Sequence, residues 1–215
     1  MKTNHFILVL FLNLIFYQNL AGQKSFEIGS NYILTSEKLF SSSVNNLFKN
    51  EIFHSFGLNS KLILKSGWFF KGALNYQNNG TKLQIEETTP NIPEGTGNFN
   101  EAIWRIRSIG VQVNAGYYFL NKKSVKIGVA TGLNNLFVTK QEQEFLDTKS
   151  SDLNIYNDYL LLLNTNVDIR IQLSQKLCFN VVPLFQIQLN SNNSSDFKQR
   201  VIGSELGISY IINEK

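Results

Sequence analysis

Cysteine, proline and histidine are scarce in this chain. Of its 215 residues, one is cysteine, three are proline and two are histidine. The single thiol, Cys178, has no second cysteine with which to form an internal disulfide, so no disulfide framework holds the fold. The sequence has no cluster of His, Cys and carboxylate residues at the spacing of metal ligands, and we expect neither a metal nor a cofactor.

Long apolar runs are also scarce, and the one that exists is at the N-terminus. Residues 6–17 are apolar apart from Asn13, Lys2 precedes them, and the small residues Ala21 and Gly22 follow. This pattern is typical of a cleaved secretory signal peptide. An uncleaved anchor is the alternative, but the run is shorter than the ~20 residues that a spanning helix needs. We predict a signal peptide at residues 1–22 and one domain at residues 23–215.

The charge balance is mild. The formal net charge is +4, and loss of Lys2 with the signal peptide leaves 19 basic and 16 acidic residues, or +3. So small an excess indicates no particular charged partner, and we expect no nucleic acid to bind. The mean hydropathy of -0.11 would suit a soluble protein. A transmembrane β-barrel gives a similar value, because its apolar residues alternate with polar ones.

Strict alternation is what the sequence does contain. From Leu161 to Leu173 every second residue is apolar or Thr165, which is the period of an extended strand with one apolar face. The run is long enough to cross a bilayer as a tilted strand, which takes roughly 9 to 11 residues. Similar runs give an even number of strands, so the sheet can close. The eight predicted strands are residues 26–34, 51–59, 62–76, 108–120, 125–137, 161–173, 177–189 and 201–212.

The charged residues of these strands all fall on one face. A Lys or Arg on the lipid side at the bilayer midplane costs about 2 to 4 kcal/mol, and the apolar faces contain no charged residue. We therefore expect the apolar faces to meet lipid, the inverse of a soluble lipocalin-like barrel. The lumen of eight strands is only wide enough for its own side chains, so its charges should pair in a network. They are Glu27, Lys65, Lys71, Lys126, Asp168, Arg170 and Glu205.

The connections alternate between short and long. Turns are expected at residues 60–61, 121–123 and 174–176, and long loops at 35–50, 77–107, 139–159 and 190–199. Outer-membrane barrels have their short turns in the periplasm and their long loops outside. Arg105 and Arg107 would then lie just beyond a strand on the outside, within reach of lipopolysaccharide phosphates. Pro183, in the middle of a strand, predicts a local bulge.

Two neighbouring strands resemble a known family. The stretch Ser108-Ile-Gly-Val-Gln-Val-Asn-Ala-Gly-Tyr-Tyr-Phe119, a turn with Lys122 and Lys123, and a return strand with Gly128 and Gly132 resemble the PorT-like outer-membrane β-barrel proteins of Bacteroidota. That family takes its name from a member needed for protein secretion. The resemblance implies location and architecture, since a fold does not carry a function with it.

The sequence thus predicts an all-β fold, an eight-stranded antiparallel up-and-down transmembrane β-barrel in the outer membrane. We expect a monomer without catalytic activity, with a structural, surface-contact or secretion-accessory role through its external loops. Its partners would be outer-membrane lipid, lipopolysaccharide or other envelope proteins. Two alternatives stay open: a narrow channel for ions or small solutes, and a lipid-modifying enzyme that uses His54, the one histidine beyond the signal peptide.

Overall fold

The structure, a computed structural model, consists of β-strands and their connections. It describes residues 23–40, 48–49, 51–84, 101–145, 148–152, 157–190 and 198–214, and the expected signal peptide lies outside them. No helix in this part of the chain is long and apolar enough to cross a bilayer. The strands are β1 Gln23–Phe40, β2 Phe48–Lys49, β3 Glu51–Leu64, β4 Trp68–Gln84, β5 Glu101–Asn121, β6 Val125–Phe145, β7 Thr148–Asp152, β8 Tyr159–Gln172, β9 Leu177–Gln188 and β10 Lys198–Glu214.

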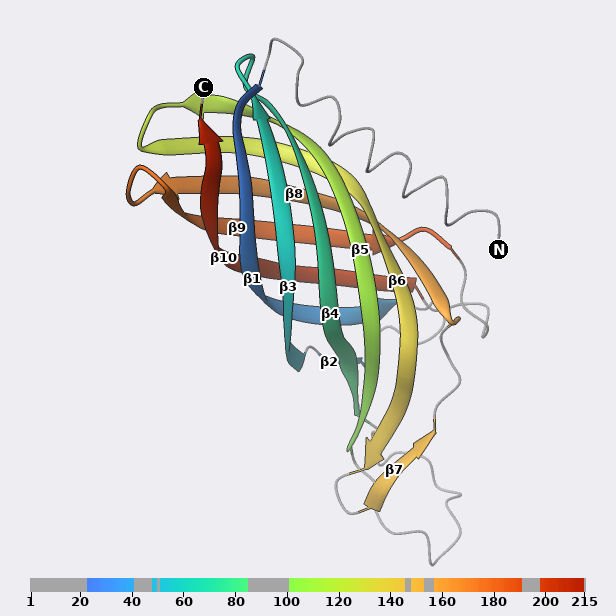
Figure 1. The fold of residues 1–215 in the computed structure, drawn as a ribbon. Helices are drawn as coiled ribbons and strands as arrows, with labels where there is room; N and C mark the ends of the chain where they lie inside the picture. The colour runs from blue at the N-terminus through green and yellow to red at the C-terminus, as the bar shows by residue number, and fades with distance from the viewer. Residues whose placement is uncertain are drawn as a thin grey trace, which may run out of the picture.

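Eight of these strands close into a barrel (Figure 1). Each long strand pairs antiparallel with the strands before and after it along the chain, and β1 pairs with β10 from Ser25 opposite Glu214 to Phe40 opposite Lys198. This pairing of the first and last strands leaves the barrel without an open edge. The prediction of an eight-stranded antiparallel up-and-down barrel is confirmed.

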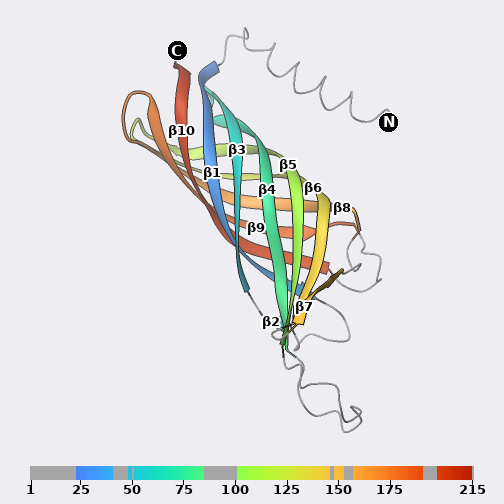
Figure 2. The same cartoon turned by 60° about the horizontal axis from the view of Figure 1, so that its bottom comes forward.

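The two ends of the barrel differ. Short turns join β3 to β4, β5 to β6 and β8 to β9 at the end that we call the turn end, which also holds Gln23 and Glu214. At the opposite end, the loop end, β4, β5 and β6 continue as a three-stranded wall past the other strands (Figures 1 and 2). Strand β5 begins at Glu101 rather than at the predicted Ser108. The predicted strand begins too late because the apolar residues change face along β5. In the wall Trp104 and Ile106 point inward and Arg105 and Arg107 point outward, the reverse of the belt, where the apolar face is outside.

The first hairpin lies elsewhere than predicted. The expected turn at residues 60–61 is wrong, because β3 continues to Leu64 and the chain reverses at residues 65–67. There the amide of Gly67 donates to the carbonyl of Leu64 at 3.1 Å, and Gly67 has a φ of 92°, which favours glycine. Leu64 and Trp68 both face outward, so the alternation runs through the turn in phase and hides it. The dipeptide Ser66–Gly67 was the turn signal.

Pro183 does not cause a bulge. The register between β9 and β10 stays constant past Pro183, which lies opposite Ser204. On the other side the ladder to β8 lapses between Leu184 and Val181 and resumes without a shift. Pro183 faces outward. The missing amide of proline is therefore accommodated by a local gap in the ladder, and the predicted bulge is wrong.

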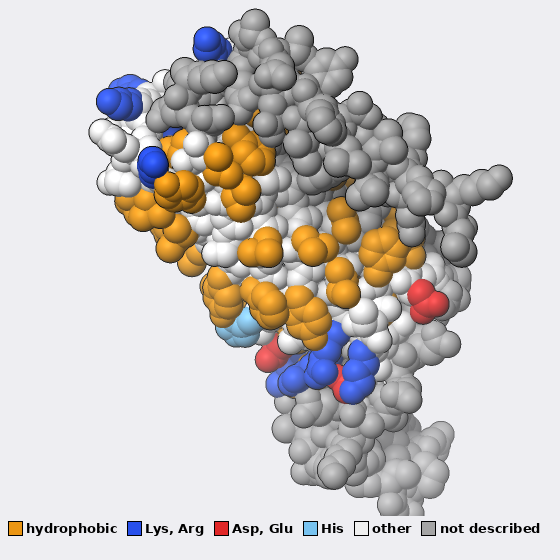
Figure 3. Space-filling view, viewed as in Figure 1, with side chains coloured by type: hydrophobic (Ala, Val, Ile, Leu, Met, Phe, Trp, Pro, Cys, Tyr) orange, Lys and Arg blue, Asp and Glu red, His pale blue; other side chains and the backbone are white. Residues whose placement is uncertain are grey.

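The outer surface of the barrel carries a belt of apolar side chains. Figure 3 shows them as a band, with Lys and Arg gathered beyond both of its edges. Aromatic rings pair between neighbouring strands at both ends of the belt. Near the turn end the ring centres of Trp68 and Tyr117 are 5.6 Å apart, and near the loop end those of Phe137 and Tyr159 are 5.6 Å apart. Aromatic residues at two levels are typical of membrane barrels, whose interfaces they line. A surface this apolar suits lipid, not water.

Inside the barrel, asparagines lie over glycines of the neighbouring strands. Asn31 on β1 is opposite Gly57 on β3, which is opposite Asn75 on β4, which is opposite Gly110 on β5. Amides fill the space above Gly57, where a Cβ would lie 2.0 Å from Oδ1 of Asn75 and 2.8 Å from Oδ1 of Asn31. The missing side chains of the glycines therefore make room for hydrogen-bonding amides in the narrow lumen.

This packing predicts that Gly57→Ala destabilises the barrel by about 1–3 kcal/mol, the usual cost of overpacking. The new methyl group would also lie 2.6 Å from the carbonyl oxygen of Leu74, which belongs to the backbone and cannot turn away. Gly207→Ala is the matched control, since the atom nearest to its new Cβ would be the carbonyl oxygen of Ser30 at 3.0 Å. Urea unfolding of the refolded barrel measures both, and equal losses would contradict the packing argument.

Candidate functional site

The charged groups of the lumen form ion pairs that cross the barrel. Lys61 on β3 lies 2.7 Å from Asp168 on β8, and the guanidinium of Arg170 on β8 lies 2.6 Å from Glu27 on β1. Lys71 on β4 pairs with Glu205 on β10. The strands of each pair are not neighbours in the sheet, so each ion pair bridges the interior. All six of these side chains are at most 4% exposed.

Neutral groups link two of these pairs into one network. The hydroxyl of Tyr118 donates to Asp168 at 2.8 Å, and Lys61 also donates to Oδ1 of Asn180 at 3.3 Å. The amide of Asn180 donates to Ser209 at 3.0 Å, and the Ser209 hydroxyl donates to Glu27 at 3.1 Å. The ammonium of Lys126 lies 5.8 Å from the centre of the Tyr118 ring, a cation–π distance.

Charge in the lumen is balanced. Among the described residues the buried cations are Lys61, Lys71, Lys126 and Arg170. The buried anions of the same part of the chain are Glu27, Glu37, Asp168 and Glu205. Equal numbers of each sign mean that no excess charge has to be held in a medium of low dielectric constant, where an unpaired ion is costly.

The sequence located most of the charged residues of the lumen but missed two, Lys61 and Glu37, the second because it lies in a predicted loop. Glu27, Lys71, Lys126, Asp168, Arg170 and Glu205 lie buried in the lumen. Lys65 does not, because it is exposed in the turn between β3 and β4. Lys61 takes the place in the lumen that the sequence reading gave to Lys65, since β3 continues past the predicted turn. Lys61 lies on the same face of β3 as Ser55 and Asn59, and this alternation was the signal that could have identified it as a lumen residue.

Layers of neutral side chains fill the lumen on both sides of the charges. Near the turn end, Phe69 stacks on Tyr118 with the ring centres 4.4 Å apart, and both pack with Ile63 and Ala130. Toward the loop end, Asn75 accepts from Asn31 and donates to Gln112, both at 3.3 Å. Buried apolar side chains follow at the loop end: Phe53, Ile106, Leu136, Leu160 and Leu162. These neutral layers pack the interior of the barrel, and they keep the charged groups out of contact with solvent.

His54 and Cys178, two residues whose side chains could carry chemistry, lie apart from the charged network. No set of three or more His, Cys, Asp and Glu side chains in the described part of the chain comes together in a way that could hold a metal ion. His54 lies on the outer face near the loop end, where its Nδ1 is hydrogen-bonded to the hydroxyl of Tyr32 and the two rings stack 5.8 Å apart. Cys178 is fully buried.

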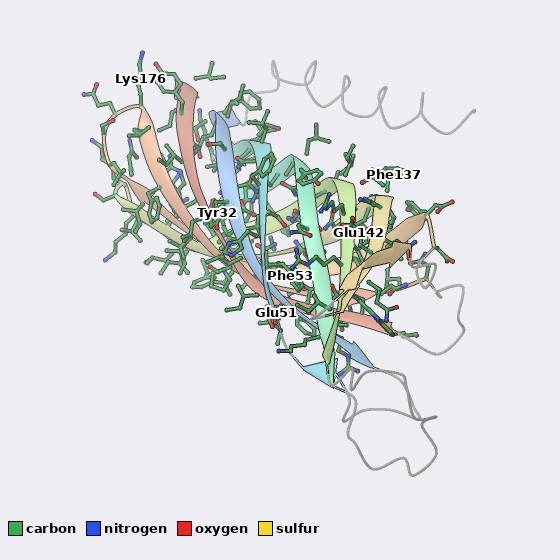
Figure 4. The ribbon with its side chains drawn as sticks, turned by 90° about the horizontal axis from the view of Figure 1, so that it is seen from below. Tyr32, Glu51, Phe53, Phe137, Glu142 and Lys176 are labelled. Atoms are coloured by element: carbon green, nitrogen blue, oxygen red, sulfur yellow. The ribbon has the colours of Figure 1, made fainter. Side chains whose placement is uncertain are left out.

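Arg105 and Arg107 lie on the outer face of the wall formed by β4, β5 and β6. Arg107 pairs with Glu142 on β6 at 3.0 Å, and Lys140 pairs with the same carboxylate. The hydrogen bond from Lys140, with the charges of Arg107 and Arg105, holds the pKa of Glu142 below its usual value despite some desolvation. Glu142 is therefore ionised at neutral pH. Figure 4 shows Phe137 and Glu142 along the same strand and Lys176 at the opposite end of the barrel.

Two solved structures of bacterial proteins are similar to the whole barrel. A major outer membrane protein from Thermus thermophilus has a TM-score of 0.52 and 9% identity, over 90% of this chain and 100% of that chain. Ail, the attachment invasion locus protein of Yersinia pestis, has a TM-score of 0.51 and 11% identity, over 88% of this chain and 99% of that chain. Neither a family model nor a curated protein sequence matches the chain. At these identities the likeness establishes the fold alone.

The network predicts that Asp168→Asn costs about 3–5 kcal/mol, because it leaves Lys61 buried without its counter-ion. The double variant Lys61→Met with Asp168→Leu removes both charges and should lose clearly less. Lys65→Gln is the control, and a change in the exposed turn should stay within about 0.5 kcal/mol. Urea unfolding of refolded protein measures all three, and a loss in Lys65→Gln as large as that in Asp168→Asn would contradict this assignment.

Proposed function

We propose that this chain is an outer-membrane β-barrel protein without catalytic activity, whose role is structural or is carried out by contacts at its loop end, a secretion-accessory role among them. The observation that carries the proposal is the division of the strands into an apolar outer face and a lumen closed by paired charges. The expected signal peptide and the fold shared with a major outer membrane protein support the location. The PorT-like pattern of residues 108–137, which form the hairpin of β5 and β6, supports the family.

The filled lumen favours contact over transport. A path for ions or small solutes needs polar groups that solvent can reach, as in the wider barrels that leave an aqueous channel. Here Asp168 and Arg170 are each 1% exposed, and both are paired with residues across the lumen. What the barrel offers to other molecules is its outer face and the wall of β4, β5 and β6, which extends past the belt.

His54 gives little support to the enzyme alternative. Its imidazole is on the outer face and is hydrogen-bonded to Tyr32, whereas a nucleophilic mechanism needs a serine or similar group next to the histidine and a third group that orients it. A tyrosine and a histidine at the edge of an apolar belt suit an interface, because both side chains have an apolar body and a polar tip.

A charged residue introduced on the apolar face tests whether that face meets lipid. Val113 is outward-facing midway along the apolar part of β5. Val113→Lys should weaken insertion of the urea-unfolded protein into lipid vesicles by about 2–4 kcal/mol. Gln175→Lys, in the exposed turn between β8 and β9, is the matched control and should insert as the parent does. Equal insertion of the two variants would mean that the apolar face does not meet lipid.

The closed lumen predicts that the barrel conducts no ions. Purified, folded protein in a planar bilayer should give no discrete conductance steps, because the pairs of Lys71 and Arg170 are not accessible to solvent. A mock preparation from cells without the protein sets the background. Conductance steps that change when Lys71 and Arg170 are neutralised together, as glutamines, would instead establish the channel function.

A further inference from the structure

The short turns at the turn end carry charges of one sign. They contribute four residues that we call the turn lysines: Lys65 between β3 and β4, Lys122 and Lys123 between β5 and β6, and Lys176 between β8 and β9. All four are exposed, and none of their ammonium groups forms an ion pair within the residues that the structure describes. On the face drawn in Figure 3, the charged side chains visible at this end are blue.

Carboxylates do not balance the turn lysines. Glu27 and Asp168 lie toward this end, but both are buried and form ion pairs inside the lumen. At the strand ends, Lys24 of β1 and Glu214 of β10 add one charge of each sign, and these two cancel. The described part of the turn end therefore keeps the positive charge of the turn lysines as an excess.

The apolar belt reaches each of these turns. Six outward-facing apolar residues flank them: Leu64 and Trp68, Phe119 and Val125, and Leu173 and Leu177. No turn lysine is more than three residues from one of them. Three residues span about 10 Å along a strand, or about 8 Å along the membrane normal at the usual tilt of a barrel. The polar headgroup layer is roughly 5 to 7 Å deep on each side of a bilayer, so the turn lysines lie at its level.

Lys176 shows how an ammonium is held at the edge of the belt. Its Nζ lies 5.7 Å from the centre of the Tyr210 ring, which faces outward on β10 and is 48% exposed. The side chain therefore leans along the belt and does not extend away from it. Figure 4 shows Lys176 at this end of the barrel. An ammonium in this position can form charge-assisted hydrogen bonds with a phosphate of the headgroup layer.

We propose that the turn lysines bind the phosphates of anionic phospholipids, so that the barrel gathers these lipids around its turn end. The inference rests on the proposed function, which places the belt in lipid. It commits to a lipid and not to an acidic protein, because the short turns keep the lysines beside the belt at the level of the headgroups. A zwitterionic headgroup is gathered less, since its own cation repels the lysine.

Trp68 reports on lipid at the turn end. It is 50% exposed on the belt, whereas Trp104, the other tryptophan of the chain, is buried. Folded protein is inserted into vesicles of phosphatidylcholine and phosphatidylglycerol, and either lipid in turn carries brominated acyl chains, which quench tryptophan fluorescence on contact. We expect the ratio of phosphatidylglycerol to phosphatidylcholine at Trp68 to exceed the bulk ratio about fivefold, which corresponds to about 1 kcal/mol. A ratio equal to that of the bulk would overturn the proposal.

Variants test whether the turn lysines cause the enrichment. Lys65→Gln with Lys122→Gln should lower the ratio at Trp68 at least about threefold, whereas Lys65→Arg with Lys122→Arg keeps the charge and should keep the ratio. Lys140→Gln with Lys198→Gln is the matched control, because it removes two exposed cations at the loop end and should leave the ratio unchanged. No loss in the first variant, or an equal loss in the control, would overturn the proposal.

The remaining outcomes separate this inference from the proposed function. If no brominated lipid quenches Trp68 in protein that is folded by heat-modified gel mobility, the belt does not meet lipid and the proposed function is wrong. If both lipids quench it in their bulk ratio, only the lipid site is wrong. Poly-glutamate is the probe for an acidic protein partner. If it binds the detergent-folded parent more tightly than Lys65→Gln with Lys122→Gln while the lipid ratio is that of the bulk, the turn lysines serve a protein and the proposal is overturned.

Discussion

The structure depends on ion pairs that exist only when the barrel is closed. Lys61 and Asp168 belong to β3 and β8, and Arg170 and Glu27 to β8 and β1. None of these strands is the neighbour of its partner in the sheet, so hairpin formation alone brings no pair together. Closure of β1 on β10 is therefore the step that neutralises the interior. A partly formed sheet would carry the same charges without partners, which makes closure cooperative.

Because these charges pair with one another, the surfaces that can contact other molecules are on the outside of the barrel. Side chains that are used to neutralise one another are not available to a ligand, and the amide and apolar layers on both sides occupy the remaining space of the lumen. The surfaces that stay available are the apolar belt and the wall of β4, β5 and β6. A small barrel that encloses nothing can still present a rigid surface to the membrane and to the loop side.

The sequence predicted the architecture well because alternation is a strong signal when one face meets lipid. It predicted which side each charged residue faces wherever the strand was correctly bounded, as for Asp168 and Arg170. It failed at the first hairpin, because the turn around Gly67 keeps Leu64 and Trp68 in phase. That single misplacement removed Lys61 from the predicted lumen and put Lys65 there. Other features could not be read from alternation at all. A groove on the outer face lies at the seam of β1 and β10, where Ser30 is opposite Ile208, and only the pairing of the first and last strands establishes that register.

Buried ion pairs add little net stability in general, because desolvation offsets much of their attraction. Their effect on register is larger. A slip of β8 by one residue would turn Asp168 and Arg170 toward lipid and Leu163 toward the lumen. A cation on the lipid side costs up to about 2–4 kcal/mol at the midplane and less toward the rim, where Arg170 lies two residues from the end of β8. Each partner on the far side would in addition keep an uncompensated charge. The lumen charges therefore penalise a barrel that is misaligned by one residue more than they stabilise the correct one, which is a physical reason for a polar lumen where hydrocarbon could also fill the space.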